Sequence, residues 1–221
     1  MRPDLLIVGD SHTAALHQAA RARGLDARLF FLSGNYWHEN RMRPHAELGI
    51  SAAYRRPLQR QVQAFAGEVG GSVFPPGVPV LASIGYHLGR LVPVFTRHGH
   101  TPVDDPDESR LFVSDAFLRS FILHNRGNLL RILRRAARQS DLLVIAPPMI
   151  QADPVSLHFA RTITAMLTEA GIRVFDPRQE PDWADQPLPE SLRAADGVHG
   201  NAAYGEQVLK RLFDRGLIRA A

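Results

Sequence analysis

The chain has no cysteine among its 221 residues. It therefore forms no disulfide, holds no metal through thiolate ligands and has no cysteine nucleophile. Its apolar runs are much shorter than the roughly 20 residues that cross a bilayer, so we expect no membrane span. Residues 1–4 lead directly into a strand pattern without the apolar core of a signal peptide, and we therefore expect a cytoplasmic location.

Lysine is nearly absent: Lys210 is the only one. The basic residues are therefore almost all arginines, and the net charge of the chain is +4. Four arginines recur at helical spacing opposite apolar residues, a pattern typical of a solvated helix face: Arg131, Arg134, Arg135 and Arg138. Neither interleaved aromatic residues nor a nucleic-acid-binding motif accompanies them, and so we expect no nucleic-acid partner. The oligomeric state stays open.

Apolar runs that suit strands alternate with amphipathic segments that suit helices. Strands are expected at residues 5–8, 28–32, 78–84, 142–146 and 172–175, and helices at 13–23, 57–66, 115–139, 154–170 and 202–215. Ser114 and Asp153 are the expected N-caps of two of these helices. The alternation predicts a single α/β domain, residues 1–221, with helices on both faces of a mainly parallel five-stranded sheet. We predict the flavodoxin-like strand order 2-1-3-4-5 for this three-layer α/β/α sandwich.

Two irregular stretches follow predicted strands, at residues 35–54 and 98–109. We expect both near the carboxyl edge of the sheet, where open α/β sheets bind ligands. The second stretch carries acidic residues at 104, 105, 107 and 108, and histidines lie in both. None of these residues shows the close spacing of a zinc site, so we predict neither a metal nor a cofactor.

Two short motifs at opposite ends of the chain carry the chemistry. The apolar run at residues 5–8 ends in Gly9-Asp10-Ser11-His12, which presents a serine just before a helix. Asp196 and His199 stand three positions apart near the other end. A serine nucleophile needs a base, and the base needs an acid that orients it. Each motif alone is typical of an ordinary helix start, but both together on one α/β pattern favour a triad.

Four segments of the chain together resemble the SGNH/GDSL hydrolase superfamily. Val8–His12 is similar to the first block of that family, in its GDSH form, and Gly34 to the glycine of the second block. The segment 84–87 stands at the place of the third block, and 196–199 is similar to the last block, Asp-x-x-His. The resemblance spans nearly the whole chain.

The resemblance implies a role for each matched residue. Ser11 would be the nucleophile, His199 the base and Asp196 the acid that orients the base. The backbone N–H groups of Ser11 and Gly34 would bind the oxyanion. The third block, which includes Gly85, would supply a side-chain donor.

The third block departs from the family pattern, because His87 stands where asparagine is expected and Leu88 where aspartate is expected. A neutral histidine can still donate one N–H, so His87 is a candidate for the oxyanion donor. Asn35, beside Gly34, is a second candidate.

The sequence therefore predicts a serine esterase that hydrolyses small O-acyl esters, with acetyl as the leading acyl group and carbohydrate as one candidate for the alcohol part. Two alternatives stay open. One is an O-acetyltransferase that uses the same triad with a sugar acceptor, and the other is a non-catalytic glycan-binding module of the same fold. The enzyme hypotheses require the Ser11 hydroxyl within hydrogen-bond reach of His199, and His199 within reach of Asp196.

Overall fold

A central parallel sheet organises the molecule. The computed structural model describes residues 2–37, 41–52, 55–104, 109–150, 153–184 and 186–219. The sheet has five strands in the order β2-β1-β5-β8-β9, and every neighbouring pair is parallel. The strands are β1 (Leu5–Gly9), β2 (Ala27–Phe31), β5 (Pro79–Ser83), β8 (Asp141–Ile145) and β9 (Val174–Phe175). In chain order this is the predicted arrangement 2-1-3-4-5, and the predicted fold class is confirmed.

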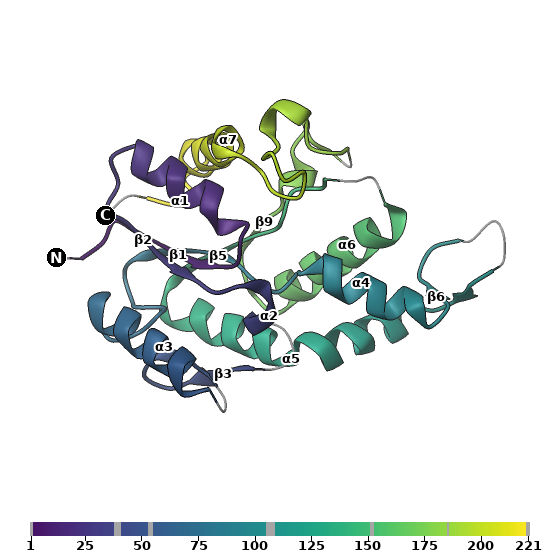
Figure 1. Cartoon of the computed structure of the whole chain (residues 1–221), viewed down its shortest axis with the longest axis horizontal. Helices are drawn as coiled ribbons and strands as arrows, with labels where there is room; N and C mark the ends of the chain where they lie inside the picture. Colours follow the sequence, from purple (N-terminus) through teal and green to yellow (C-terminus); the bar gives the residue numbers. More distant parts are fainter. Residues whose placement is uncertain are drawn as a thin grey trace.

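Helices cover both faces of the sheet, as Figure 1 shows. On one face lie α1 (Thr13–Ala22) and α7 (Ala202–Asp214), and on the other α3 (Arg56–Glu68), α5 (Asp115–Gln139) and α6 (Pro154–Glu169). Within the described residues no helix is long and apolar enough to cross a membrane.

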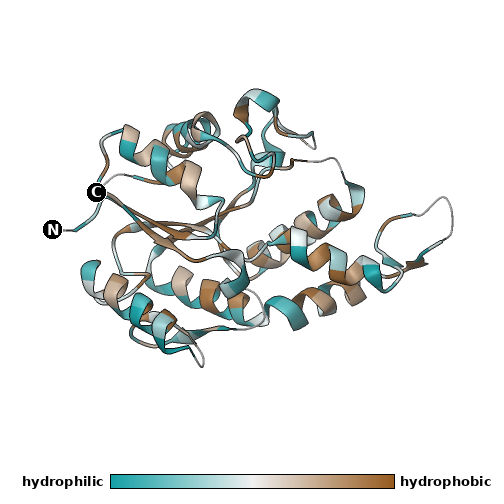
Figure 2. Ribbon diagram, viewed as in Figure 1, coloured by the Kyte–Doolittle hydropathy of each residue, from teal (hydrophilic) through white to brown (hydrophobic). Residues whose placement is uncertain are grey.

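The apolar run near the start of the chain contributes side chains to the core on both faces of the sheet. Leu6 and Val8 belong to the cluster on the α5 side of the sheet, whereas Leu5 and Ile7 belong to the cluster on the α7 side. Successive strand residues point to opposite faces, so a strand that is covered on both faces is apolar at every position. Figure 2 shows this pattern as strands that are brown along their length between amphipathic helices.

The contact between α1 and α7 is unusually close at one point. A Cβ atom placed on Gly205 of α7 would lie 2.2 Å from the backbone oxygen of Ala15 in α1, so only glycine fits there. Helix α1 begins two residues after Ser11, and α7 begins three residues after His199. The packing of these two helices therefore brings the two ends of the chain to the same edge of the sheet.

The predicted N-caps are confirmed. Ser114 Oγ accepts the N–H of Phe117 at 3.3 Å, and the Asp153 carboxylate accepts the N–H groups of Val155 and Ser156 at 3.1 Å each. Helix α5 runs unbroken through Gly127.

The irregular stretches hold more regular structure than predicted. The first contains the short helix α2 (Gly34–Trp37) and a hairpin of β3 (Met42–His45) and β4 (Gly49–Ala52). A further helix, α4 (Leu88–Arg97), was not predicted and contains Pro93. The second stretch includes β6 (His100–Thr101), which pairs with β7 (Leu111–Phe112). Short 3-10 turns stand at η1 (Pro177–Gln179) and η2 (Glu190–Leu192). Of the acidic run, residues 105–108 lie outside the described residues.

Replacing Gly205 with alanine tests the close helix contact. We expect Gly205→Ala to destabilise the protein by about 1–3 kcal/mol, because the added methyl group overpacks α1 against α7. The matched control is Gly67→Ala on α3, where a Cβ meets nothing within 4 Å. That change removes a helical glycine without a clash and is expected to stabilise by about 0.5–1 kcal/mol. Urea unfolding measures both; equal effects would show that the contact at Ala15 is not tight.

Candidate active site

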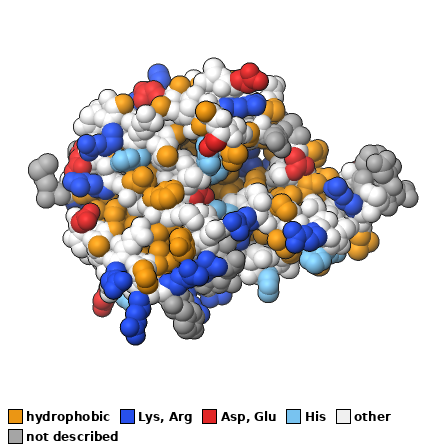
Figure 3. Space-filling model, in the orientation of Figure 1, with side chains coloured by type: hydrophobic (Ala, Val, Ile, Leu, Met, Phe, Trp, Pro, Cys, Tyr) orange, Lys and Arg blue, Asp and Glu red, His pale blue; other side chains and the backbone are white. Residues whose placement is uncertain are grey.

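A pocket of about 590 Å³ opens at the carboxyl edge of the sheet. The connections that follow β1, β5 and β8 line it, together with the segment before α7. The remaining walls are the first residues of α2 and α6 and the short turn η1. Figure 3 shows a hollow near the centre of this face with histidine side chains at its border and hydrophobic side chains beside it. These are the segments that topology places together at one edge of a parallel sheet.

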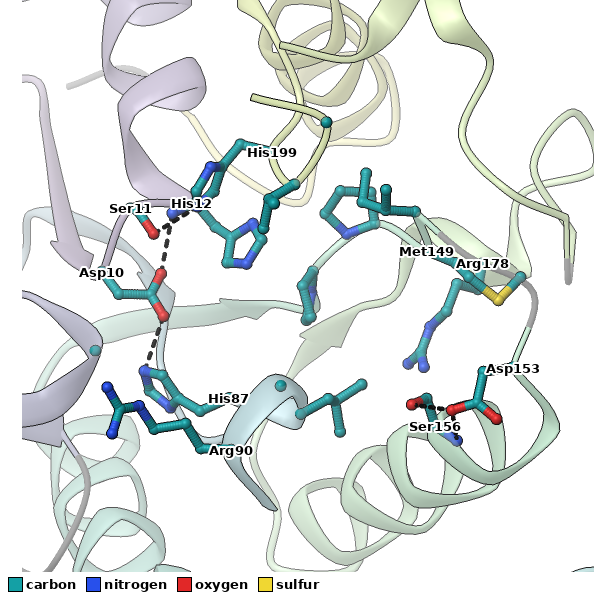
Figure 4. Close-up of a pocket in the computed structure, with 18 of the residues that line it drawn as sticks. Asp10, Ser11, His12, His87, Arg90, Met149, Asp153, Ser156, Arg178 and His199 are labelled. Atoms are coloured by element: carbon teal, nitrogen blue, oxygen red, sulfur yellow. Dashed lines mark hydrogen bonds and ion pairs between the residues drawn. The ribbon is translucent and has the colours of Figure 1, made fainter. Parts of the chain in front are cut away.

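Ser11, His199 and Asp196 form a hydrogen-bonded chain at the mouth of this pocket. Ser11 Oγ lies 2.6 Å from His199 Nε2, and His199 Nδ1 lies 2.6 Å from Asp196 Oδ2. Residues 188 positions apart in the sequence are thus in direct contact. The predicted distances between the three side chains are confirmed, and Figure 4 shows Ser11 and His199 together at one end of the pocket.

The turn that carries Asp196 also fixes its charge. Asp196 Oδ1 accepts the backbone N–H groups of Val198 at 2.9 Å and His199 at 3.1 Å, and Gly197 between them has φ +65°. These backbone hydrogen bonds and the bond from the His199 ring hold the pKa of Asp196 at about 2. The ionised Asp196 accepts a hydrogen bond from Nδ1–H, which leaves the Nε2 lone pair available to accept a hydrogen bond from the Ser11 hydroxyl.

Two residues at the pocket have backbone N–H groups without an acceptor. Ser11 and Gly34 both line the pocket. Within the described part of the chain, the N–H of neither residue has an acceptor. Ser11 stands just before α1 and Gly34 begins α2, so both N–H groups precede a helix and have no partner inside it.

His87 pairs with a buried carboxylate. Its backbone is left-handed (φ +46°), and its side chain, only 5% exposed, places Nε2 at 2.8 Å from Asp10 Oδ2. The ring also lies against Gly34, where a Cβ would meet its Cδ2 atom at 3.4 Å. The other oxygen of Asp10 accepts the N–H of His12 at 3.0 Å. The Asp10–His87 pair therefore holds the turn that presents Ser11.

The charge of Asp10 follows from this pair. Burial alone would raise the pKa of Asp10, but the hydrogen bond and the charge of His87, together with His12, lower it. Local spacing gave no sign of this pair, because 77 positions separate the two residues.

The structure does not bring two of the predicted binding residues to the pocket. Asn35 is exposed on α2 and does not line it. Gly85 is buried, and a Cβ there would meet Leu133. With φ +109°, Gly85 shapes the loop that carries His87, which is a structural role.

A second histidine packs beside the base. The His12 and His199 rings lie 4.8 Å apart, centroid to centroid. Burial lowers the pKa of His12, so this ring stays neutral near neutral pH and adds no positive charge beside His199. The pocket also reaches Asp153, Ser156 and Arg178, of which the sequence identified only Asp153, and only as a helix cap. Among the residues that the structure describes, no three His, Asp or Glu side chains form a group that could hold a metal ion.

Fold and site together define a three-layer α/β protein with a hydrolase-type Ser–His–Asp arrangement at the edge of its sheet. No protein-family model matches the chain, and no curated protein matches it either. Solved structures of SGNH/GDSL-type esterases match it along nearly the whole chain.

Three of these structures illustrate the likeness. A psychrotrophic esterase, EstA, from Pseudoalteromonas sp. is 16% identical, with a TM-score of 0.46 over 96% of this chain and 97% of its own. An acetylxylan esterase from Geobacillus stearothermophilus is 16% identical, with a TM-score of 0.48 over 98% and 96%. A GDSL-like lipase from Bacteroides thetaiotaomicron is 12% identical, with a TM-score of 0.47 over 96% and 86%. The case for an activity rests on the geometry of the site itself.

Changing Asp10 to asparagine tests the buried pair with His87. We expect Asp10→Asn to lower the free energy of unfolding by about 1–3 kcal/mol, because the amide replaces the charged partner of a buried hydrogen bond with His87. Because the pKa of Asp10 is lowered in the folded protein, the contribution is present above its ordinary value of 3.8 and is lost as the pH falls further. Urea unfolding at several pH values measures the difference.

Asp214→Asn is the control, because it makes the same change in the exposed pair that Asp214 forms with Lys210. An exposed pair of this kind contributes at most about 0.5 kcal/mol. Equal losses in the two variants would contradict a structural role for the pair of Asp10 and His87.

Proposed function

We propose that this protein is a serine ester hydrolase that cleaves short O-acyl esters, with acetyl as the first acyl group to test. The observation that carries the proposal is the unbroken chain from Ser11 Oγ through the His199 ring to Asp196, with both contacts at 2.6 Å. That order of hydroxyl, imidazole and carboxylate is what general-base activation of a serine requires.

The proposed reaction has two halves. His199 Nε2 takes the proton of the Ser11 hydroxyl as Oγ bonds to the ester carbonyl carbon, and the N–H groups of Ser11 and Gly34 stabilise the resulting oxyanion. Collapse of this intermediate breaks the bond to the alcohol oxygen, which leaves with the proton from His199. Water, deprotonated by His199, then attacks the acyl-enzyme and releases the carboxylic acid and Ser11.

Two features support a short acyl group and water as the acceptor. The His87 ring lies against Gly34, which narrows the space beside the proposed oxyanion position. The His199 side chain is 24% exposed and that of Asp196 53%, so water reaches the proposed base. A transferase must exclude water from the acyl-enzyme, and this exposure therefore favours hydrolysis. An aligned triad likewise favours an enzyme over a glycan-binding module.

Ser11→Ala is expected to reduce the hydrolysis of p-nitrophenyl acetate to the uncatalysed rate. The thermal unfolding midpoint should stay within about 2 °C of the wild type, since Ser11 is exposed and its hydroxyl bonds only to the partly exposed ring of His199. The matched control is Ser156→Ala, which removes a pocket hydroxyl away from His199. An unchanged rate in Ser11→Ala would sink the proposal, and a large fall in the unfolding midpoint would make Ser11 a structural residue.

The pH dependence of kcat/KM is expected to show no contribution from Asp196 above about pH 4. Backbone N–H groups and the His199 ring hold the pKa of Asp196 at about 2, so its carboxylate stays ionised in that range. The logarithm of kcat/KM should therefore rise with pH on the acid side at a slope no steeper than one. The hydrolysis of ethyl acetate, which does not titrate in this range, can be followed by NMR. A slope of two in this range would show that Asp196 also takes up a proton.

A further inference from the structure

The pocket extends well beyond the three proposed catalytic residues. Figure 4 shows Ser11 and His199 at one side, whereas Arg178, Asp153 and Ser156 lie together at the other. All five residues line the same cavity of about 590 Å³, a size typical of sites for whole small molecules and far larger than an acetyl group needs. The remaining space is available to the alcohol part of an ester.

Arg178 is almost entirely buried, and three of its five N–H bonds are occupied. Its side chain is 6% exposed. Nε donates to Asp176 Oδ1 at 2.7 Å, and Nη2 donates to Asp176 Oδ2 and to Thr164 Oγ1. Thr164 Oγ1 donates to Asp176 Oδ2 at 3.0 Å, so the neighbouring Tyr86 hydroxyl, at 2.8 Å, is the donor to Thr164. In the part of the chain that the structure describes, Nη1 has no acceptor.

The hydrogen bonds between Arg178, Asp176 and Thr164 determine which kind of ligand can bind at this end of the pocket. Asp176, with a side chain only 3% exposed, balances the charge of Arg178. Asp176 also occupies the edge of the Arg178 guanidinium group formed by Nε and Nη2. This is one of the edges at which arginine binds a carboxylate through two parallel hydrogen bonds. At this end the pocket therefore meets the Nη1 donors of a neutralised arginine, whereas the exposed Arg90 lines the pocket beside His87 (Figure 4).

Asp153 adds an acceptor to the same end of the pocket. Its carboxylate accepts the N–H of Val155 on Oδ1 at 3.1 Å, and on Oδ2 it accepts the N–H of Ser156 at 3.1 Å and the Ser156 hydroxyl at 2.5 Å. A carboxylate accepts about four hydrogen bonds, so one position remains. Its negative charge disfavours an anionic ligand, because like charges repel at short range.

We propose that Arg178 and Asp153 form a subsite that recognises neighbouring hydroxyl groups on a neutral alcohol part, such as that of a sugar or another polyol. A hydroxyl group both accepts and donates, so adjacent hydroxyls can accept from Arg178 Nη1 and donate to Asp153. Leu88, Met149 and Leu157 line the same pocket and suit the C–H faces of a ring. This subsite rests on the proposed function for the position of the ester and determines specificity without taking part in bond cleavage.

Three acetate esters of similar size separate the possible ligand chemistries. They are 6-O-acetyl-glucose, cyclohexylmethyl acetate without hydroxyls, and 4-(acetoxymethyl)cyclohexanecarboxylate with a negative charge. We expect the wild type to prefer acetylglucose over each of the others by at least about tenfold in kcat/KM, the effect of one or two hydrogen bonds. An equal or greater kcat/KM for the apolar or the anionic ester would overturn the proposal.

Two conservative variants test the named residues. Arg178→Lys keeps the charge beside Asp176 but loses the Nη1 donors, and Asp153→Asn keeps a good helix cap but loses the charged acceptor. Each should lower kcat/KM for acetylglucose about tenfold and leave that for p-nitrophenyl acetate within about twofold. Equal losses on both substrates would contradict a hydroxyl subsite. A variant that does not fold is replaced by Ser156→Ala, which frees one acceptor position of Asp153 and is expected to leave the preference for acetylglucose intact.

Binding without turnover separates this proposal from the proposed function. Ser11→Ala is expected to bind 6-O-acetyl-glucose in calorimetry, and Ser11→Ala with Arg178→Lys to bind it about tenfold more weakly. If the wild type hydrolyses no ester but this difference in binding is found, the hydroxyl subsite stands and the esterase proposal fails. If p-nitrophenyl acetate is hydrolysed but the two variants bind acetylglucose equally, the subsite proposal fails alone.

Discussion

The site depends on the packing of α1 against α7. Ser11 precedes one helix and His199 the other, so the distance between the two helices sets the distance between the two side chains. Gly205 allows that approach, because any side chain there would run into the backbone of Ala15. The five-stranded sheet fixes where α1 begins, and the packing of α7 on it then brings Asp196 and His199 to the same edge. The contact between these two helices thus brings Ser11 within hydrogen-bond distance of His199, which also bonds to Asp196.

Much of this arrangement could be predicted from the sequence, because it follows from local patterns and topology. The apolar run before Gly9 marks a strand covered on both faces, and residues that follow parallel strands meet at one edge. The approach of Ser11 to His199 follows from these two rules. The contact of His87 with Asp10 does not follow from them, since a contact between the end of a strand and a distant loop leaves no periodic pattern in the sequence. Arg178 is a second case, because Tyr86 and Thr164, which complete its surroundings, are far from it in the sequence.

His87 makes a buried contact that the sequence did not suggest. Its Nε2 atom pairs with Asp10 and its ring packs on Gly34. The left-handed backbone at His87 and the positive φ of Gly85 direct the ring toward Asp10. In the proposed mechanism, stabilisation of the oxyanion then comes from the backbone N–H groups of Ser11 and Gly34. His87 contributes indirectly, because it holds the turn on which Ser11 sits.

The most direct test of the central claim is the mass of the intact protein after treatment with a fluorophosphonate, which reacts covalently with activated serines. We expect a single adduct that maps to the peptide containing Ser11, is absent from Ser11→Ala and forms much more slowly in His199→Ala. No adduct, or an adduct on another serine, would show that Ser11 is not activated by His199 and would contradict the account.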